Sequence, residues 1–165
     1  MLKMRPFTIV PFRSGSAANL YSVHFHDTES DETTLFLNRT DIQEMTEDYE
    51  HLLVLLNTMT GRFGCREQFF RFESRASNAV CALYRERNRS VKIRLCCCRL
   101  GERITILGNG CIKKSRTSQE DPEYQGYIND MVMVDRLLAQ RIAAKEVVIT
   151  QAMELRGNLI FTHEE

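Results

Sequence analysis

Short apolar segments bounded by polar residues mark the beginning of the chain. This pattern predicts strands at Phe7–Phe12 and Leu20–His26, with a loop of small and polar residues at Ser14–Asn19 between them. The acidic and polar run Asp27–Thr33 predicts a second loop.

An amphipathic helix is predicted next, because apolar residues recur at intervals of three and four positions. We expect the helix to span Thr40–Met59, with Thr40 as its N-cap residue and Gln43 as the capping-box partner. Gly61 follows and is expected to end it. The apolar stripe consists of Ile42, Met45, Tyr49, Leu52, Leu53, Leu56 and Met59.

A β-hairpin is predicted in the middle of the chain, after two further strands at Gln68–Phe72 and Ala79–Tyr84. Its arms are Val91–Leu100 and Arg103–Leu107. They flank Gly101–Glu102, a pair that suits a two-residue type II′ turn.

The register of this hairpin follows from its turn and decides which residues share a face. It pairs Cys97 with Ile106 and Leu95 with Gly108. One face is then apolar and carries Val91, Ile93, Leu95, Cys97, Ile104 and Ile106. The other face carries Lys92, Arg94, Cys96, Cys98, Arg103, Thr105 and Leu107, and the same parity continues to Asn109 and Lys113. The pleat therefore predicts one sheet face on which Lys92, Arg94 and Lys113 gather.

A second amphipathic helix is predicted at Pro122–Ile142, with Ser118 near its start. Beyond it, strands are expected at Val147–Thr150 and Asn158–Thr162, with Arg156–Gly157 as a turn.

The order of these elements predicts an α+β fold, in which a central antiparallel sheet carries two packed helices. With 165 residues, of which 43% are hydrophobic and 27% charged, the composition is that of a globular chain. We expect a single domain over residues 1–145, and over residues 146–165 a strand-forming extension that packs on it.

Charge is distributed unevenly along a chain whose formal net charge is zero. Between Arg85 and Arg116 there are ten cations, against the two acids Glu86 and Glu102. A local excess of this size is typical of a site for a polyanion. An acidic protein partner and an ordinary solvated surface are the two alternatives.

The cysteines and the hydropathy pattern indicate in which cellular compartment the protein is expected. No apolar stretch is long enough to span a bilayer, and the first residues do not resemble a signal peptide, so we expect a cytoplasmic protein. The six cysteines are then expected to be reduced and to pack as small apolar residues. Cys96–Cys98 lacks the spacing of a zinc site, and neither a metal nor a cofactor is expected.

The segment KIRLCCCRLGERITILGNGCIKKSRTSQEDPE, residues 92–123, resembles the core of bacterial RelE/HigB-type toxins, the ribonuclease components of type II toxin–antitoxin systems. Arg94 matches the arginine of a central strand in that family, and ITILGNG matches the apolar strand that follows. Lys113, Lys114 and Arg116 match the basic segment. The resemblance is tight over Val91–Glu123 and extends in outline from Leu20 to Ile142.

The resemblance implies a RelE-like fold and a metal-independent endoribonuclease, an mRNA interferase for which ribosomes can be required. In this reading Arg94 stabilises transition-state charge, and Lys113 and Lys114 bind phosphate or transfer a proton. RNA is positioned by Lys92, Arg103 and Arg116, and Tyr84 stacks on a base. Gly108–Gly110 would turn the chain off the sheet, so that the basic segment closes over a phosphate lying on Arg94.

The implied partners are RNA, on the ribosome or free, and a cognate antitoxin protein, and a homodimer is left open. The alternative function is a non-catalytic RNA- or protein-binding module of a mobile element or phage, with the same fold. Expression without an antitoxin separates the two, because an active ribonuclease toxin stops growth.

Overall fold

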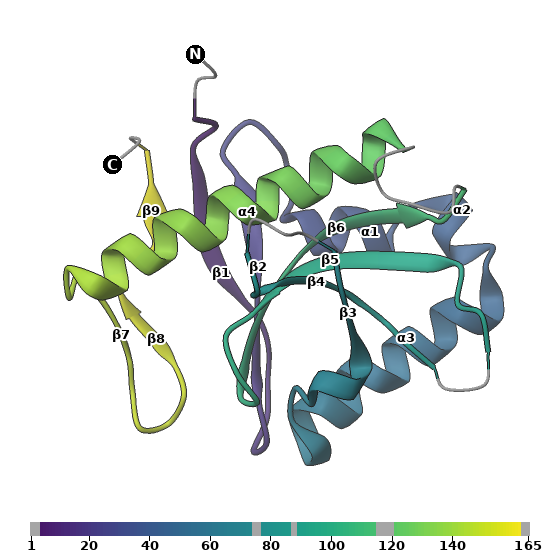
Figure 1. Ribbon diagram of the computed structural model, residues 1–165, viewed down its shortest axis with the longest axis horizontal. Coiled ribbons are helices and arrows are strands. Elements are labelled where there is room, and N and C mark those ends of the chain that lie inside the picture. The colour runs from purple at the N-terminus through teal and green to yellow at the C-terminus, as the bar shows by residue number, and fades with distance from the viewer. Residues whose placement is uncertain (1–3, 74–76, 87–88, 115–120, 163–165) are drawn as a thin grey trace.

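A mostly antiparallel sheet forms the centre of an α+β fold (Figure 1). The computed structural model describes residues 4–73, 77–86, 89–114 and 121–162. In this part of the chain seven strands follow the order β3-β4-β5-β6-β2-β1-β9, and β7 and β8 form a separate pair. The strands are β1 (Phe7–Ser14), β2 (Asn19–Phe25), β3 (Phe70–Phe72), β4 (Val80–Leu83), β5 (Ile93–Arg99), β6 (Ile104–Ile112), β7 (Val147–Ile149), β8 (Leu155–Gly157) and β9 (Ile160–Phe161).

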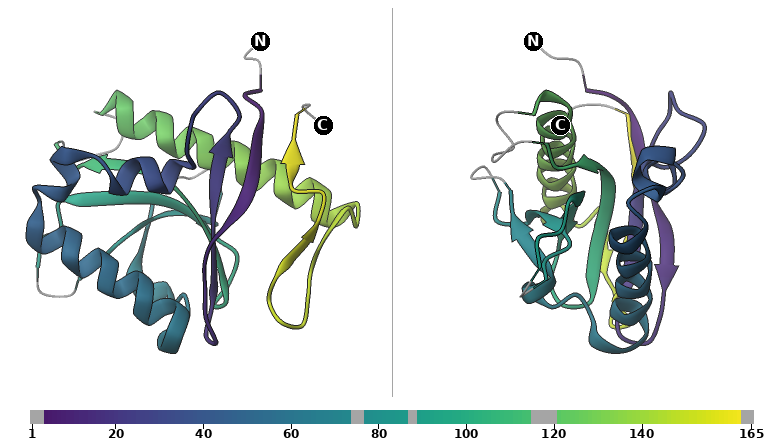
Figure 2. Two further views of the ribbon diagram at one scale, coloured as in Figure 1. Left: turned by 180° about the vertical axis from the view of Figure 1, so that it is seen from behind. Right: turned by 90° about the vertical axis from the view of Figure 1, so that its right-hand side faces the viewer.

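Helices cover both faces of the sheet, as the edge-on view of Figure 2 shows. The helices are α1 (Glu32–Leu37), α2 (Thr40–Gln43), α3 (Thr46–Thr58) and α4 (Pro122–Ala143). On one face, α4 packs with Ile128, Met131 and Val134 in the core. On the other face, Leu52 and Leu56 of α3 belong to a second core. The sheet is therefore buried on both sides.

The predicted hairpin lies at the centre of the sheet, as expected, but its register differs from the prediction. β6 pairs with β5 on one side and, in parallel, with β2 on the other. Cys97 lies opposite Leu107 because the turn holds three residues and not two, with the Leu100 N–H donating to the Ile104 carbonyl. Leu95 lies opposite Gly110 because β6 carries one extra residue, a bulge, between Leu107 and Gly110. The predicted pairs, Cys97 with Ile106 and Leu95 with Gly108, are wrong. An extra residue in one strand shifts all later pairs.

This shift changes the faces of β6. Ile104 and Ile106 join the core under α4 with Cys96 and Cys98, whereas Leu107 faces α3 with Leu95 and Cys97. The predicted single apolar face is thus wrong for β6 and correct for β5. The opposite face is not an open basic surface along its length, since α4 covers its centre.

Gly108–Gly110 do not turn the chain off the sheet. β6 continues through them to Ile112. A Cβ at position 110 would overlap the carbonyl oxygen of Arg94, and a Cβ at Gly108 would lie 2.6 Å from the Met131 sulfur. Both glycines therefore allow close packing inside the sheet.

The predicted helix Thr40–Met59 is divided into two. α2 ends at Gln43 and α3 begins at Thr46, and a π-helical turn follows at Met59–Phe63. Thr40 is the first helical residue and not the N-cap, and the Gln43 side chain donates a hydrogen bond to the Leu37 carbonyl. Gly64, with φ of 75°, follows the π-helical turn where Gly61 was expected to end the helix.

An additional helix, α1, begins in the segment predicted as the loop Asp27–Thr33. Asp31 caps it, because its carboxylate accepts a hydrogen bond from the Thr34 backbone N–H. The run of acids there is thus partly an N-terminal capping signal.

The end of the chain contributes strands, as its pattern predicts. β7 and β8 pair with each other, and β9 pairs with β1 at the edge of the main sheet. The expected turn at Arg156–Gly157 lies within β8. Ser118, the expected start of the second helix, falls outside the described residues, and Asp121 caps α4 by accepting a hydrogen bond from the Tyr124 N–H. Across the described residues, no helix combines the length and the apolar character that a membrane crossing requires.

All six cysteines are buried, and none forms a disulfide. Burial raises the pKa of the Cys96 and Cys98 thiols, and it raises that of Cys111 to about 12. Because the thiolate is the reactive form, we expect the native protein to react slowly with a thiol reagent at neutral pH. After denaturation without reductant, all six thiols should react. A lower titre would mean that a disulfide or a bound metal withholds thiols.

Candidate functional site

Strand pairing brings Lys92, Arg94 and Lys113 together at one end of β5 and β6, and we call these three residues the basic cluster. Arg94 lies opposite Cys111, and the Lys113 N–H donates a hydrogen bond of 2.6 Å to the Lys92 carbonyl. Alternate residues on paired strands share a face, so Arg94 and Lys113 lie on the side that α4 covers. Lys92 precedes β5 and borders a hollow with Glu44, Glu47 and Asp48. Lys92, Lys113 and the following Lys114 are exposed.

Arg94 differs from the lysines because it is buried, with 3% of its surface exposed. Its Nη1 donates to the carbonyls of Val91 and Ile93, at the start of the same strand. No carboxylate of the described residues forms an ion pair with it, and Nε and Nη2 have no hydrogen-bond partner among them. Burial lowers the pKa of the guanidinium, since the charged form has lost water.

Two side chains from other elements face the same corner of the sheet. Glu73 follows β3, and burial raises its pKa although Arg71, Arg94 and Lys113 act to lower it. Tyr124, in the first turn of α4, is buried, and its hydroxyl has no hydrogen-bond partner among the residues that the structure describes. Burial is the main reason that its pKa is raised, and Arg94 partly opposes the effect. The corner thus combines a buried cation, a carboxyl group and an unpartnered hydroxyl.

Arg71 links β3 to this corner. It lies opposite Ala82 in β4, which in turn lies opposite Cys96 in β5, two residues from Arg94 on the same face. Its side chain makes an ion pair of 3.9 Å with Glu73. The sequence did not predict that Arg71, Glu73 and Tyr124 belong to this site. Tyr124 fits the apolar period of its helix. Arg71 and Glu73 come close to Arg94 only because β4 pairs β3 with β5.

The other predicted site residues lie elsewhere. Arg103 is exposed at the opposite end of β6, about 26 Å from the basic cluster at roughly 3.3 Å per residue. Tyr84 is buried on the α3 face, and its hydroxyl donates to the Asp48 carbonyl, so it is not available to stack on a base. Arg116 falls outside the described residues. A phosphate also cannot lie directly on Arg94 without movement of the side chains that bury it.

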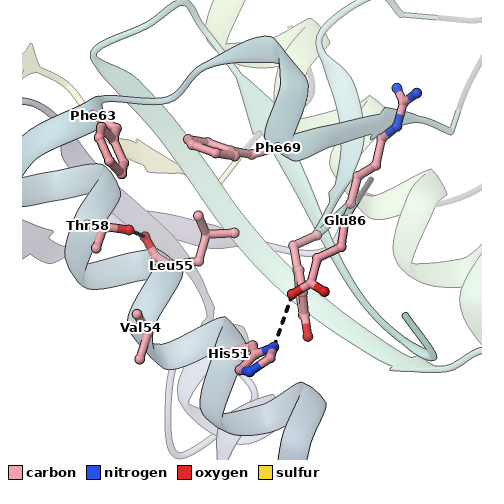
Figure 3. A pocket seen from close by; sticks show the side chains of 9 residues that line it. His51, Val54, Leu55, Thr58, Phe63, Phe69 and Glu86 are labelled. Carbon is pink, nitrogen blue, oxygen red and sulfur yellow. Dashed lines mark hydrogen bonds and ion pairs between the residues drawn. The ribbon is translucent and has the colours of Figure 1, made fainter. Parts of the chain in front are cut away.

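A second candidate site is an apolar groove on the α3 side, which Figure 3 shows from close by. Its volume is about 400 Å³. We call it the α3 groove; its lining residues are His51, Val54, Leu55, Thr58, Phe63, Phe69, Tyr84, Arg85 and Glu86. At one end, Nδ1 of His51 lies 3.0 Å from the Glu86 carboxylate.

In the described ranges, no group of three or more His, Cys, Asp or Glu side chains could hold a metal ion.

Comparison with known proteins gives this chain no relative. No protein-family model, curated protein or solved structure matches it.

Proposed function

We propose that the protein binds RNA at the basic cluster and cleaves it as a metal-independent endoribonuclease of the RelE/HigB type. The observation that carries this proposal is Arg94, a buried guanidinium without a carboxylate partner in the described residues. A buried charge is costly unless it is paired. An anionic ligand would supply the missing partner at Nε and Nη2.

The surroundings of Arg94 favour a phosphodiester over a small anion. Lys92, Lys113 and Lys114 are exposed beside it, so the positive charge continues outwards from the buried site. A polyanionic chain would contact these lysines with successive phosphates, and in the proposal the side chains that bury Arg94 move aside so that one phosphate reaches it. The zero net charge of the molecule means that this attraction acts locally.

RNA cleavage without metal requires three events at one phosphate. The 2′-oxygen loses a proton and attacks phosphorus, charge grows on the phosphoryl oxygens, and the bond to the 5′-oxygen breaks as that oxygen gains a proton. In the proposal Arg94 stabilises the phosphoryl oxygens, and Lys113 or Lys114 holds the adjoining phosphate. Glu73, whose pKa is raised by burial, and the Tyr124 hydroxyl are additional candidates for proton transfer.

The first test measures RNA affinity against salt concentration. We expect Lys92→Ala and Lys113→Ala each to flatten the dependence of log K on log salt by about 0.7, the value for one phosphate contact with a single strand. Arg103→Ala is the matched control. Because Arg103 lies at the far end of β6, its loss should leave the slope unchanged.

The second test measures cleavage and growth. Wild-type protein, with and without ribosomes, should cut RNA and should arrest bacteria when expressed in the cytoplasm without an antitoxin. Binding without cleavage in both assays would leave the alternative of a non-catalytic RNA-binding module. A protein that neither binds RNA at low salt nor slows growth would contradict the ribonuclease and the RNA-binding module, and would leave the protein-binding module as the alternative.

A further inference from the structure

We propose that the α3 groove is a docking site for an acidic peptide segment of a partner protein, which inserts a large apolar side chain between α3 and the rings of Phe63 and Phe69. The site lies on the α3 side of the sheet, whereas the basic cluster lies on the α4 side. The two proposals therefore stand on separate residues and can fail separately.

The α3 wall of the groove behaves as an apolar surface because its one hydroxyl is already bonded. Thr58 Oγ1 donates to the Leu55 carbonyl, so this residue offers its methyl group, and buried Tyr84 closes the floor with its hydroxyl bonded to the Asp48 carbonyl. Val54 is 59% exposed on the adjoining surface of α3. Figure 3 shows Val54, Leu55 and Thr58 along the helix, with Phe63 and Phe69 on the facing segment. Covering these groups removes apolar surface from water.

Cations surround the Phe63 end of the groove. The guanidinium carbons of Arg62 and Arg66 lie 5.1 and 4.9 Å from the centre of the Phe63 ring. Arg85 lines the groove itself. None of the three forms an ion pair with another described residue, whereas Glu86 is already paired with His51. The unpaired charge around the groove is therefore positive, and a ligand with several carboxylates would complement it.

The shape of the site favours an extended ligand. A second hollow of about 490 Å³ adjoins the groove and shares Phe69, Arg85 and Glu86 with it, and it extends the site to Gln68. A peptide chain can place one anchor in the apolar part while acidic residues on either side reach the separate arginines. RNA fits less well, because the wall of Val54, Leu55 and Thr58 is aliphatic and offers no aromatic face on which bases could stack.

The test uses a synthetic peptide of about twelve residues, in which one Trp and one Leu are flanked by Asp and Glu. The protein contains no Trp, so the fluorescence of the peptide reports binding to the full chain without background. We expect Val54→Glu to weaken binding by at least about tenfold, as loss of an anchor contact does. Arg62→Ala and Arg85→Ala should each weaken it by about twofold to fivefold, the effect of an exposed ion pair.

Matched controls lie on the C-terminal hairpin. Val148 is an exposed apolar residue of β7, and Arg156 is an exposed cation of β8, so Val148→Glu and Arg156→Ala should leave the affinity unchanged. A peptide with Gln and Asn in place of its acids should bind more weakly, and RNA affinity should be the same in Val54→Glu as in the parent.

Three outcomes would overturn the docking proposal. The peptide could bind the parent and Val54→Glu equally, or not at all. A single-stranded RNA could lose affinity in Val54→Glu, which would assign the groove to nucleic acid. Sedimentation could show that Val54→Glu dissociates an oligomer of the parent, which would assign the groove to a second copy of the chain.

Discussion

Gly110→Ala is expected to unfold the protein, or to lower its free energy of unfolding by about 3 kcal/mol or more. A Cβ at this position would overlap the carbonyl oxygen and carbon of Arg94 on the neighbouring strand. Both are backbone atoms in the centre of the sheet, so relief requires β5 and β6 to separate. Urea denaturation followed by circular dichroism measures the effect.

Gly126→Ala is the matched control, because a Cβ there has nothing within 4 Å. Gly126 lies within α4, where replacement of glycine by alanine is expected to add about 0.5–1 kcal/mol of stability. Equal stability of the two variants would show that β6 does not approach Arg94 as described. RNA affinity should be unchanged in Gly126→Ala.

Gly110 also shows why one part of the fold was mispredicted. The sequence Gly–Asn–Gly is common in turns, and a turn at Gly108–Gly110 is what composition favours. The same residue type is needed where another backbone or a bulky side chain comes close, as Arg94 and Met131 do here. Only the neighbouring strand and helix distinguish the two uses, and neither is visible in the local sequence.

The hairpin register depends on a three-residue turn and on one extra residue in β6, and neither leaves a signal in the apolar pattern. Where one face of a sheet is open to water, a slip of one residue exposes apolar side chains and reveals the error. Here both faces are buried, so Ile106 and Leu107 are equally acceptable on either side. The strands and their central position were predictable, but the faces of β6 were not.

The long helix was predicted correctly in its apolar stripe and incorrectly in its continuity. Ile42, Leu52, Leu56 and Met59 are all buried in one core. A break between Gln43 and Thr46 keeps these residues on the core side, so periodicity alone cannot detect it. The α3 groove depends on the π-helical turn that follows, which places Phe63 beside Phe69, with ring centres 6.4 Å apart.

In the candidate site, too, the residues of the hairpin could be predicted from the sequence, whereas residues from distant elements could not. Arg94 and Lys113 lie on one side through paired strands, and Lys92 adjoins them because its carbonyl accepts from the Lys113 N–H. The grouping was predicted although the register was not, because the longer turn and the extra residue in β6 together shift the pairing by two positions. Glu73 and Tyr124 come from β3 and α4, and their approach requires the whole sheet order. The burial of Arg94 also depends on elements that are distant in the sequence.

Arg94→Met is expected to stabilise the protein while it removes RNA cleavage. Methionine retains the apolar stem and removes a buried charge that has no carboxylate partner among the described residues. Replacement of poorly compensated buried charge by an apolar group often stabilises a protein, and we expect a gain of about 1–2 kcal/mol. The melting temperature should rise by about 2–8 °C, on the scale of 2–4 °C per kcal/mol for a chain of this size. Cleavage should fall by about 100-fold or more, the cost of losing a group that stabilises transition-state charge.

Arg141→Met supplies the comparison, because Arg141 is equally buried, with 4% exposed, but well partnered. Its Nη1 donates to the carbonyls of Asn158 and Ile160, and the guanidinium lies 3.8 Å from the centre of the Phe161 ring. Its replacement should lower the melting temperature and leave the rate of cleavage per folded molecule unchanged. Differential scanning calorimetry measures the melting temperature of both variants, and a cleavage assay measures their rates. If Arg94→Met is destabilised as strongly as Arg141→Met and still cleaves RNA, Arg94 serves the fold and not an anionic ligand.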